Sequence, residues 1–196
     1  SRPFFSLPLL PLVREISAVC RVNGIGEILL GGNTAIGILY EDHGAMAIDK
    51  PAGWIVAPEQ WTNTARNLQR ALRSAIAARE PWTRARRIRF LRFVHRLDAD
   101  TSGVLLLAKS SGALRAYSEM FRQRAVTKVY LAVVEGSPPQ AKWTSKMALA
   151  PDPAQRGKMK VDQRGQPSET RFALICRREG RSRSEEHTSE LQSRQV

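Results

Sequence analysis

Hydrophobic and polar positions change their period along the chain, and the period predicts which segments are strands and which are helices. Residues 35–50 contain two short apolar runs around a polar turn at 42–44, which predicts a hairpin. At 62–80 the apolar residues recur at helical spacing behind a Thr/Asn start. We therefore expect an amphipathic helix with a basic outer face, ended by Pro81.

The middle of the chain predicts a polar loop between two strands. Residues 90–94 and 104–108 are apolar runs of strand length, and the residues at 95–103 between them are polar. A serine at position 110 or 111 can cap a second helix. Residues 129–134 then predict another apolar strand.

The last third of the chain is richer in turn-forming residues. Proline, glycine and lysine dominate residues 137–166, which predicts a long surface loop with one short strand at 147–150. Residues 170–176 predict one more strand. Because helices and strands are mixed without regular βαβ alternation, we predict an α+β fold: a mixed, mainly antiparallel sheet with flanking helices.

We expect one domain with one active site, at residues 35–182, because 196 residues are too few for two complete domains. Residues 1–34 are interpreted as a poorly defined leader. Residues 183–196 are polar and without periodicity, and most of them resemble the translation of a common sequencing-adapter oligonucleotide. We therefore expect this tail to be non-native and to lie outside the fold.

The charge of the chain points to a polyanionic partner. Lysine and arginine total 31 against 18 acidic residues, a formal net charge of +13, and so basic a chain is usually built to bind nucleic acid. Seven arginines are interleaved with aromatic residues between positions 79 and 96, as in a phosphate-contacting segment: Arg79, Arg84, Arg86, Arg87, Arg89, Arg92 and Arg96. A merely soluble basic surface is the alternative.

Other functional classes have weak support. No run of eighteen apolar residues could span a bilayer. The two cysteines, Cys20 and Cys176, are far apart and suit a reducing compartment. The histidines and cysteines lack metal-ligand spacing, and the glycine-rich segments match neither a dinucleotide fingerprint nor a Walker motif. We expect no membrane segment, no metal and no cofactor.

The most informative segment runs from His95 to Lys109 and reads HRLDADTSGVLLLAK. It sets an acid, basic residues, hydroxyls and a glycine in a loop, where reactive groups concentrate. Arg96 stands two residues before Asp98, and a guanidinium near a half-buried carboxylate favours the ionised form. Such a carboxylate can act as nucleophile or base at a sugar. A purely structural Arg–Asp pair is the alternative, which residue chemistry alone favours.

This segment resembles the HRLD-x-x-TSG signature of the RluA-type pseudouridine synthases, a family that modifies ribosomal and transfer RNA. Residues 40–58, YEDHGAMAIDKPAGWIVAP, are similar to the family's first hairpin and KPAG loop. Residues 126–136, VTKVYLAVVEG, are similar to its K-x-Y strand, and residues 168–175, SETRFALI, to the strand after its central loop. Four matches in the same order are far more specific than one.

The resemblance implies roles for individual residues. Asp98 corresponds to the family's catalytic aspartate, Tyr130 to the tyrosine that stacks on the target base, and Arg96 to the arginine that helps to organise the flipped-out nucleotide. Without the motif, Tyr130 would be interpreted as a core aromatic. We expect RNA contacts from five further residues: His95, Lys128, Lys50, Arg89 and Arg92. For the two lysines, structural support of the site is the alternative role.

The implied function is isomerisation of uridine to pseudouridine in structured ribosomal or transfer RNA. Nothing is oxidised or added in this reaction, so no cofactor is expected. The expected partner is RNA, the expected compartment is the cytoplasm, and the expected state is a monomer. The fold implied is the catalytic fold of the family in incomplete form, because a GRTHQIR-like motif that follows the SETRF-like strand in relatives is absent here. We therefore expect weak or no activity from this chain.

Two other functions stay open. A catalytically silent RNA-binding protein of the same fold would keep the basic surface without the reaction. A hydrolase could use Asp98 on a nucleoside or glycoside, but no motif places a second carboxylate to act as its acid partner.

Overall fold

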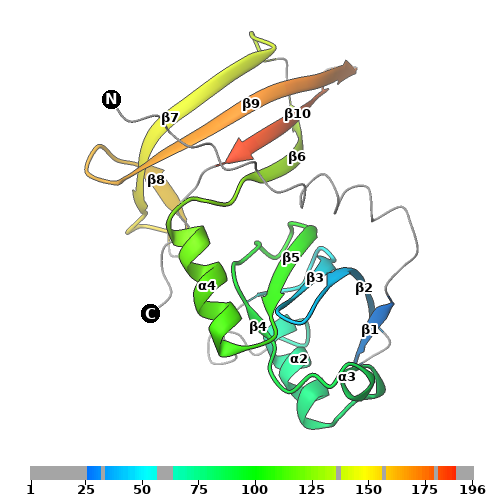
Figure 1. Cartoon of the computed structure of the whole chain (residues 1–196). Helices are drawn as coiled ribbons and strands as arrows, with labels where there is room; N and C mark the ends of the chain where they lie inside the picture. The colour runs from blue at the N-terminus through cyan, green and yellow to red at the C-terminus, as the bar shows by residue number, and fades with distance from the viewer. Residues whose placement is uncertain are drawn as a thin grey trace, which may run out of the picture. The chain divides into compact units, whose positions relative to one another are not determined.

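The structure is a computed structural model of the chain (Figure 1). It describes these residues: 26–31, 34–56, 64–135, 138–155, 158–178 and 181–188. The chain divides into two compact units, one ending at Ser118 and the other beginning at Glu119. Each unit has its own antiparallel sheet, and α4 carries the chain from the first into the second. The predicted domain limits at 35 and 182 stay predictions.

The first unit is built on a five-stranded sheet in the order β1-β2-β3-β5-β4. Its strands are β1 (Glu27–Leu30), β2 (Thr34–Glu41), β3 (Ala45–Lys50), β4 (Arg92–Phe93) and β5 (Gly103–Ala108). β2 and β3 form the predicted hairpin. The sequence did not predict β1, which pairs with β2 and buries Ile28 and Leu30. Part of the predicted leader therefore contributes a strand to the sheet.

The helices follow the predicted periodicity with different ends. α2 (Leu68–Ala77) begins after Asn67, whose side chain accepts a hydrogen bond from the amide of Arg70 (3.0 Å). The predicted start at 62 and 63 lies outside the described residues. Pro81 begins the short helix α3 (Pro81–Ala85), since the first helical position needs no amide donor.

The third described helix, α4 (Ser111–Arg122), begins where a serine cap was predicted. The Ser110 hydroxyl accepts a hydrogen bond from the amide of Ala113 (3.1 Å). None of the described helices is long and apolar enough to cross a membrane.

β3 and β5 form the centre of the core. Four successive residues of β3, from Ala45 to Ile48, are at most 3% exposed, so both faces of this strand are covered. Leu105 and Leu107 of β5 are fully buried. The last pair of this ladder joins Lys50 to Gly103, which fixes the start of β5 beside the end of β3.

The second unit holds another five-stranded antiparallel sheet, in the order β6-β10-β9-β7-β8 (Figure 1). Its strands are β6 (Lys128–Glu135), β7 (Lys142–Pro151), β8 (Met159–Val161), β9 (Gln166–Arg178) and β10 (Arg181–Thr188). None of the side chains that the structure describes in this sheet is buried. Two antiparallel sheets with flanking helices confirm the predicted α+β class.

Two predictions about the C-terminal third need correction. The predicted loop at 137–166 contains more strand than we expected: the predicted short strand at 147–150 is part of the longer β7, which pairs with β9 over eight residues, and β8 follows it. Pairing with a neighbouring strand outweighed the turn-forming composition.

The tail, which we expected to lie outside the fold, supplies β10 between β6 and β9 up to Thr188. Strand pairing uses backbone groups that any sequence offers. Its non-native origin stays a prediction, and residues 189–196 lie outside the described part of the chain.

Candidate active site

Asp98 lies on a loop that joins two neighbouring strands of the first unit. The loop leaves β4 and enters β5, and both strands belong to the sheet. Leu97 is 7% exposed and anchors the loop to the core, whereas the Asp98 side chain is exposed. The amide of Thr101 donates to the carbonyl of Asp98 (3.2 Å), which closes a turn. The carboxylate is thus presented to solvent from an anchored backbone.

Lys50 holds this loop from inside the protein. Its side chain is fully buried. Its ammonium group donates to three backbone carbonyls: Pro51 (3.1 Å), Ala99 (3.0 Å) and Thr101 (2.7 Å). Burial lowers the pKa of Lys50, and the carboxylates of Asp100 and Asp98 offset part of that effect. The ammonium group of Lys50 is therefore fixed beneath the Asp98 loop by its carbonyl contacts.

The KPAG segment packs against the same loop through its backbone. The amide of Gly53 donates to the carbonyl of Ala99 (2.8 Å), the carbonyl that also accepts from Lys50. Gly53 has φ +81°, a conformation that favours glycine. The first motif of the predicted family and its central motif are therefore bonded to each other at Ala99.

His95 ties the beginning of the loop to β5. Its Nε2 accepts a hydrogen bond from the amide of Leu106 (3.1 Å), which assigns the ring hydrogen to Nδ1. Nδ1 lies 3.4 Å from the carbonyl of Arg96. The imidazole therefore has a structural role in the loop, in addition to the RNA contact that we predict for it.

The arginines of the predicted RNA-binding segment project into solvent. Arg89, Arg92 and Arg96 are all exposed. The Arg92 guanidinium lies 5.8 Å from the centre of the Phe90 ring, a cation–π contact. The predicted pairing of Arg96 with Asp98 stays a prediction. Asp98 is exposed where we expected a half-buried group, and the buried ammonium of Lys50 lies under this loop.

Tyr130 and Lys128 belong to the second unit. Both lie on β6, two residues apart, so their side chains point to the same face of the sheet. Both are half-exposed. The structure thus brings together His95, Arg96, Asp98 and Lys50 within the first unit, and Tyr130 with Lys128 within the second.

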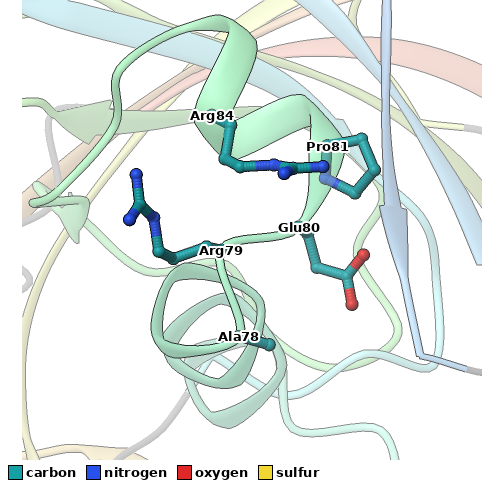
Figure 2. A pocket seen from close by; sticks show the side chains of 5 residues that line it. All are labelled: Ala78, Arg79, Glu80, Pro81 and Arg84. Atoms are coloured by element: carbon teal, nitrogen blue, oxygen red, sulfur yellow. The ribbon is translucent and has the colours of Figure 1, made fainter.

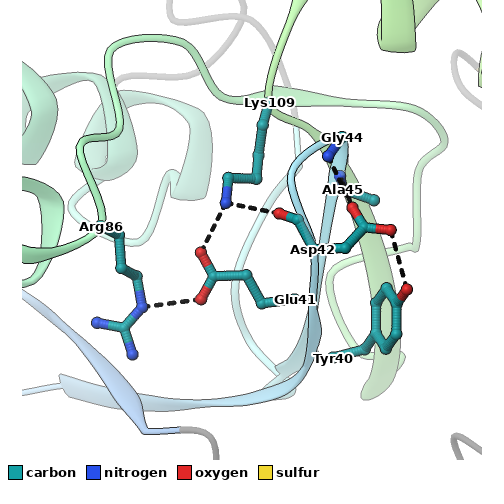
Figure 3. Close-up of polar contacts among 7 residues, drawn as sticks. All are labelled: Tyr40, Glu41, Asp42, Gly44, Ala45, Arg86 and Lys109. Carbon is teal, nitrogen blue, oxygen red and sulfur yellow. Dashed lines mark hydrogen bonds and ion pairs between the residues drawn. The ribbon is translucent and has the colours of Figure 1, made fainter.

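Sequence reasoning missed an ionic cluster at the hairpin tip (Figure 3). The carboxylate of Glu41 accepts from Arg86 (2.9 Å) and from Lys109 (2.8 Å). Lys109 also donates to the carbonyl of Asp42 (2.7 Å). This cluster fixes the far end of β5 to the β2–β3 hairpin. The only signal in the sequence was the lysine at the end of the HRLD segment.

An open depression of about 410 Å³ lies where α2 meets α3 (Figure 2). It is lined by Ala78, Arg79, Glu80, Pro81 and Arg84. The Arg79 and Arg84 side chains flank the depression, and the Glu80 carboxylate turns away from both (Figure 2). Two guanidinium groups beside an open surface suit an RNA phosphate better than a small molecule. No residue of the Asp98 loop lines this depression.

Comparisons with known proteins agree with the motifs. The family profile described as RNA pseudouridylate synthase matches residues 45–195. The ribosomal large subunit pseudouridine synthase C of Haemophilus ducreyi is 39% identical over 139 residues, which cover 70% of this chain and 40% of that protein. The protein of the same name from Escherichia coli strain K12 is 38% identical over 144 residues, with the same coverage. The chain therefore spans about 40% of the length of these relatives.

Solved structures show the same fold. The structure titled Human RNA Pseudouridylate Synthase Domain Containing 4 matches this chain with a TM-score of 0.60 and 19% sequence identity. The match covers 90% of this chain and 62% of the human chain. The structure titled Human RNA Pseudouridylate Synthase Domain Containing 1 matches with a TM-score of 0.60 and 20% sequence identity. That match covers 79% of this chain and 60% of the human chain. Since the family profile covers well over half of the sequence, the chain belongs to the RNA pseudouridylate synthase family.

Proposed function

We propose that this protein isomerises uridine to pseudouridine in ribosomal RNA, with Asp98 as the catalytic carboxylate. The observation that carries the proposal is the exposed carboxylate of Asp98 on a loop that Lys50 and Gly53 hold in place. Ribosomal RNA is favoured over transfer RNA because the names of the bacterial relatives specify the large ribosomal subunit. Action on ribosomal RNA also agrees with the cytoplasmic location that we expect.

The reaction needs few groups. The bond between the ribose and the base nitrogen breaks, the uracil rotates while it is held, and a new bond forms through carbon 5. A carboxylate can capture the anomeric carbon, or it can remove the proton at the 2′ position. In both routes the target base must leave its stack, which costs a few kcal/mol that protein contacts offset.

Other residues would bind and orient the RNA. Tyr130 would stack on the target uracil, and Arg96 would help to hold the flipped-out nucleotide. Arg89, Arg92 and Lys128 would contact phosphates, since their side chains reach solvent. We predicted that Lys50 either supports the site or contacts RNA. Its three carbonyl contacts and complete burial support the first of these roles.

The test is tritium release from carbon-5-labelled uridine in ribosomal RNA, measured with protein in excess over RNA so that the weak activity we expect of this chain can be detected. We expect Asp98→Asn to lower the rate by about a thousandfold or more, because the amide can neither attack nor accept a proton. Asp100→Asn is the matched control, since Asp100 is an exposed acid on the same loop, and it should keep most of the activity. Full activity of Asp98→Asn would exclude the proposed role.

The same experiment distinguishes an isomerase from a catalytically silent RNA-binding protein of this fold. Such a protein would bind RNA with strong salt dependence and release no tritium. Its binding would not respond to Asp98→Asn.

A further inference from the structure

The second sheet carries a row of aromatic residues on one face. The strand register pairs Tyr130 with Glu186, Glu186 with Phe172, and Phe172 with Trp143. Residues directly opposite each other in a ladder project their side chains to the same face. The rings of Tyr130, Phe172 and Trp143 therefore stand in one row across the sheet.

Two of these rings form a stacked pair. The centres of Trp143 and Phe172 are 4.7 Å apart, and their planes differ by 7°. Both side chains are half-exposed. Because both side chains are half-exposed, part of the stacked pair is open to solvent. An aromatic ring with an uncovered face is what proteins use to stack nucleobases without sequence preference.

Polar groups form the neighbouring row. Lys128 lies two residues before Tyr130, and the register continues from Lys128 through Thr188 to Thr170 and Ser145. The ammonium of Lys128 and the hydroxyls of Thr170 and Ser145 thus project to the same face as the rings. Proteins usually bind single-stranded RNA by stacking its bases on aromatic rings while cationic and polar groups contact its backbone.

The spacing fits neighbouring nucleotides. Adjacent strands are roughly 4.8 Å apart, so Tyr130 and Phe172, two strands apart, are separated by roughly 10 Å. Two nucleotides can bridge this distance when their bases are unstacked and splayed, the form in which proteins read single-stranded RNA.

We propose that the Trp143–Phe172 pair is a second stacking platform, which binds a nucleobase adjacent to the uridine held by Tyr130. The proposal rests on the proposed function, because that function places single-stranded RNA on this face. An ordinary cross-strand pair that only stabilises the sheet is the competing explanation.

The test measures binding of a fluorescein-labelled, single-stranded oligoribonucleotide with one central uridine, by fluorescence anisotropy. We expect Trp143→Leu to raise Kd by about tenfold, because leucine fills the space without offering a flat ring. Trp143→Phe keeps a ring and should restore most of the affinity. Leu131→Ala is the matched control, since Leu131 is 60% exposed on β6 and points to the opposite face from Tyr130, and it should leave Kd unchanged.

Abasic nucleotides separate stacking from folding. In the intact protein, removing the base next to the central uridine should weaken binding about as much as Trp143→Leu does. In Trp143→Leu the same removal should cost nothing more, because the partner ring is already absent. A variant with an unfolded sheet would instead bind the abasic RNA more weakly than the intact protein. Normal binding of every RNA by folded Trp143→Leu would overturn the platform.

The outcome is independent of the test of isomerisation. If Asp98→Asn and the intact protein both release no tritium but Trp143→Leu weakens binding, the proposed reaction fails and the platform is retained. If tritium is released and Trp143→Leu binds normally, the platform alone fails.

Discussion

Lys50 is the residue on which the geometry of the Asp98 loop depends most directly. A buried ammonium group is stable only when its hydrogen-bond donors are satisfied. Here three carbonyls accept hydrogen bonds from the ammonium group, and two of them belong to the Asp98 loop. The sequence predicted that this lysine supports the site or contacts RNA, but its burial could not be predicted, because charged side chains are rarely fully buried.

Replacing Lys50 by methionine should lower the free energy of unfolding by about 2 kcal/mol, because the carbonyls of Pro51 and Thr101 lose a charged donor. Denaturant unfolding at neutral pH measures this change. Lys146→Met is the control: this side chain is 73% exposed, and its 3.4 Å ion pair with Glu169 should contribute less than about 0.5 kcal/mol. Equal stability of Lys50→Met and the unmodified protein would show that the methionine repacks without loss.

At the scale of elements, the β2–β3 hairpin is held by one acidic side chain. Asp42 accepts from the amides of Gly44 (2.7 Å) and Ala45 (2.6 Å) and from the hydroxyl of Tyr40 (2.9 Å) (Figure 3). Burial raises the pKa of Asp42, but the hydrogen bonds together outweigh burial, and the pKa falls below 3.8. The hairpin is therefore more stable with Asp42 ionised.

The sign of this shift gives a prediction for acid stability. Because the folded pKa is the lower one, the contribution of Asp42 is complete above the unfolded value of 3.8 and is lost as pH falls through the folded value. Asp42→Asn should cost about 1 kcal/mol at pH 7, since a neutral amide makes weaker hydrogen bonds. The difference between the denaturant midpoints of the two proteins should become smaller as pH falls below 3.8. A constant difference at all pH values would contradict the assignment.

Elements with a clear period were predictable, and elements defined by pairing were not. The hairpin and β5 followed from apolar runs, and the cap at Ser110 followed from one residue type. Of β7 only residues 147–150 were predicted, because charged and polar residues interrupt its first half and its full length depends on pairing with β9. At the candidate site, the roles that the motif implies for Asp98, Tyr130 and Arg96 stay predictions. The burial of Lys50 and the contacts of Glu41 depend on tertiary packing that no local pattern encodes.

At the scale of the whole molecule, the core is unevenly distributed. Every fully buried hydrophobic side chain among the described residues lies between Ile28 and Ala108, in the first unit. The sheet of the second unit exposes large apolar side chains instead, including Leu131 at 60% and Val133 at 70%. Hydrophobic burial is the main favourable contribution to folding, so the two units should differ in local stability.

Hydrogen–deuterium exchange should therefore distinguish the two sheets. We expect the hydrogen-bonded amides of β3 and β5 to exchange on the order of a hundredfold more slowly than those of β7 and β9, because opening the second sheet exposes less apolar surface that was buried. The comparison is internal, since all four strands have paired antiparallel neighbours. Equal protection in both sheets would show that the units open together, and the stability of the Asp98 loop would then depend on the second sheet as well as on Lys50.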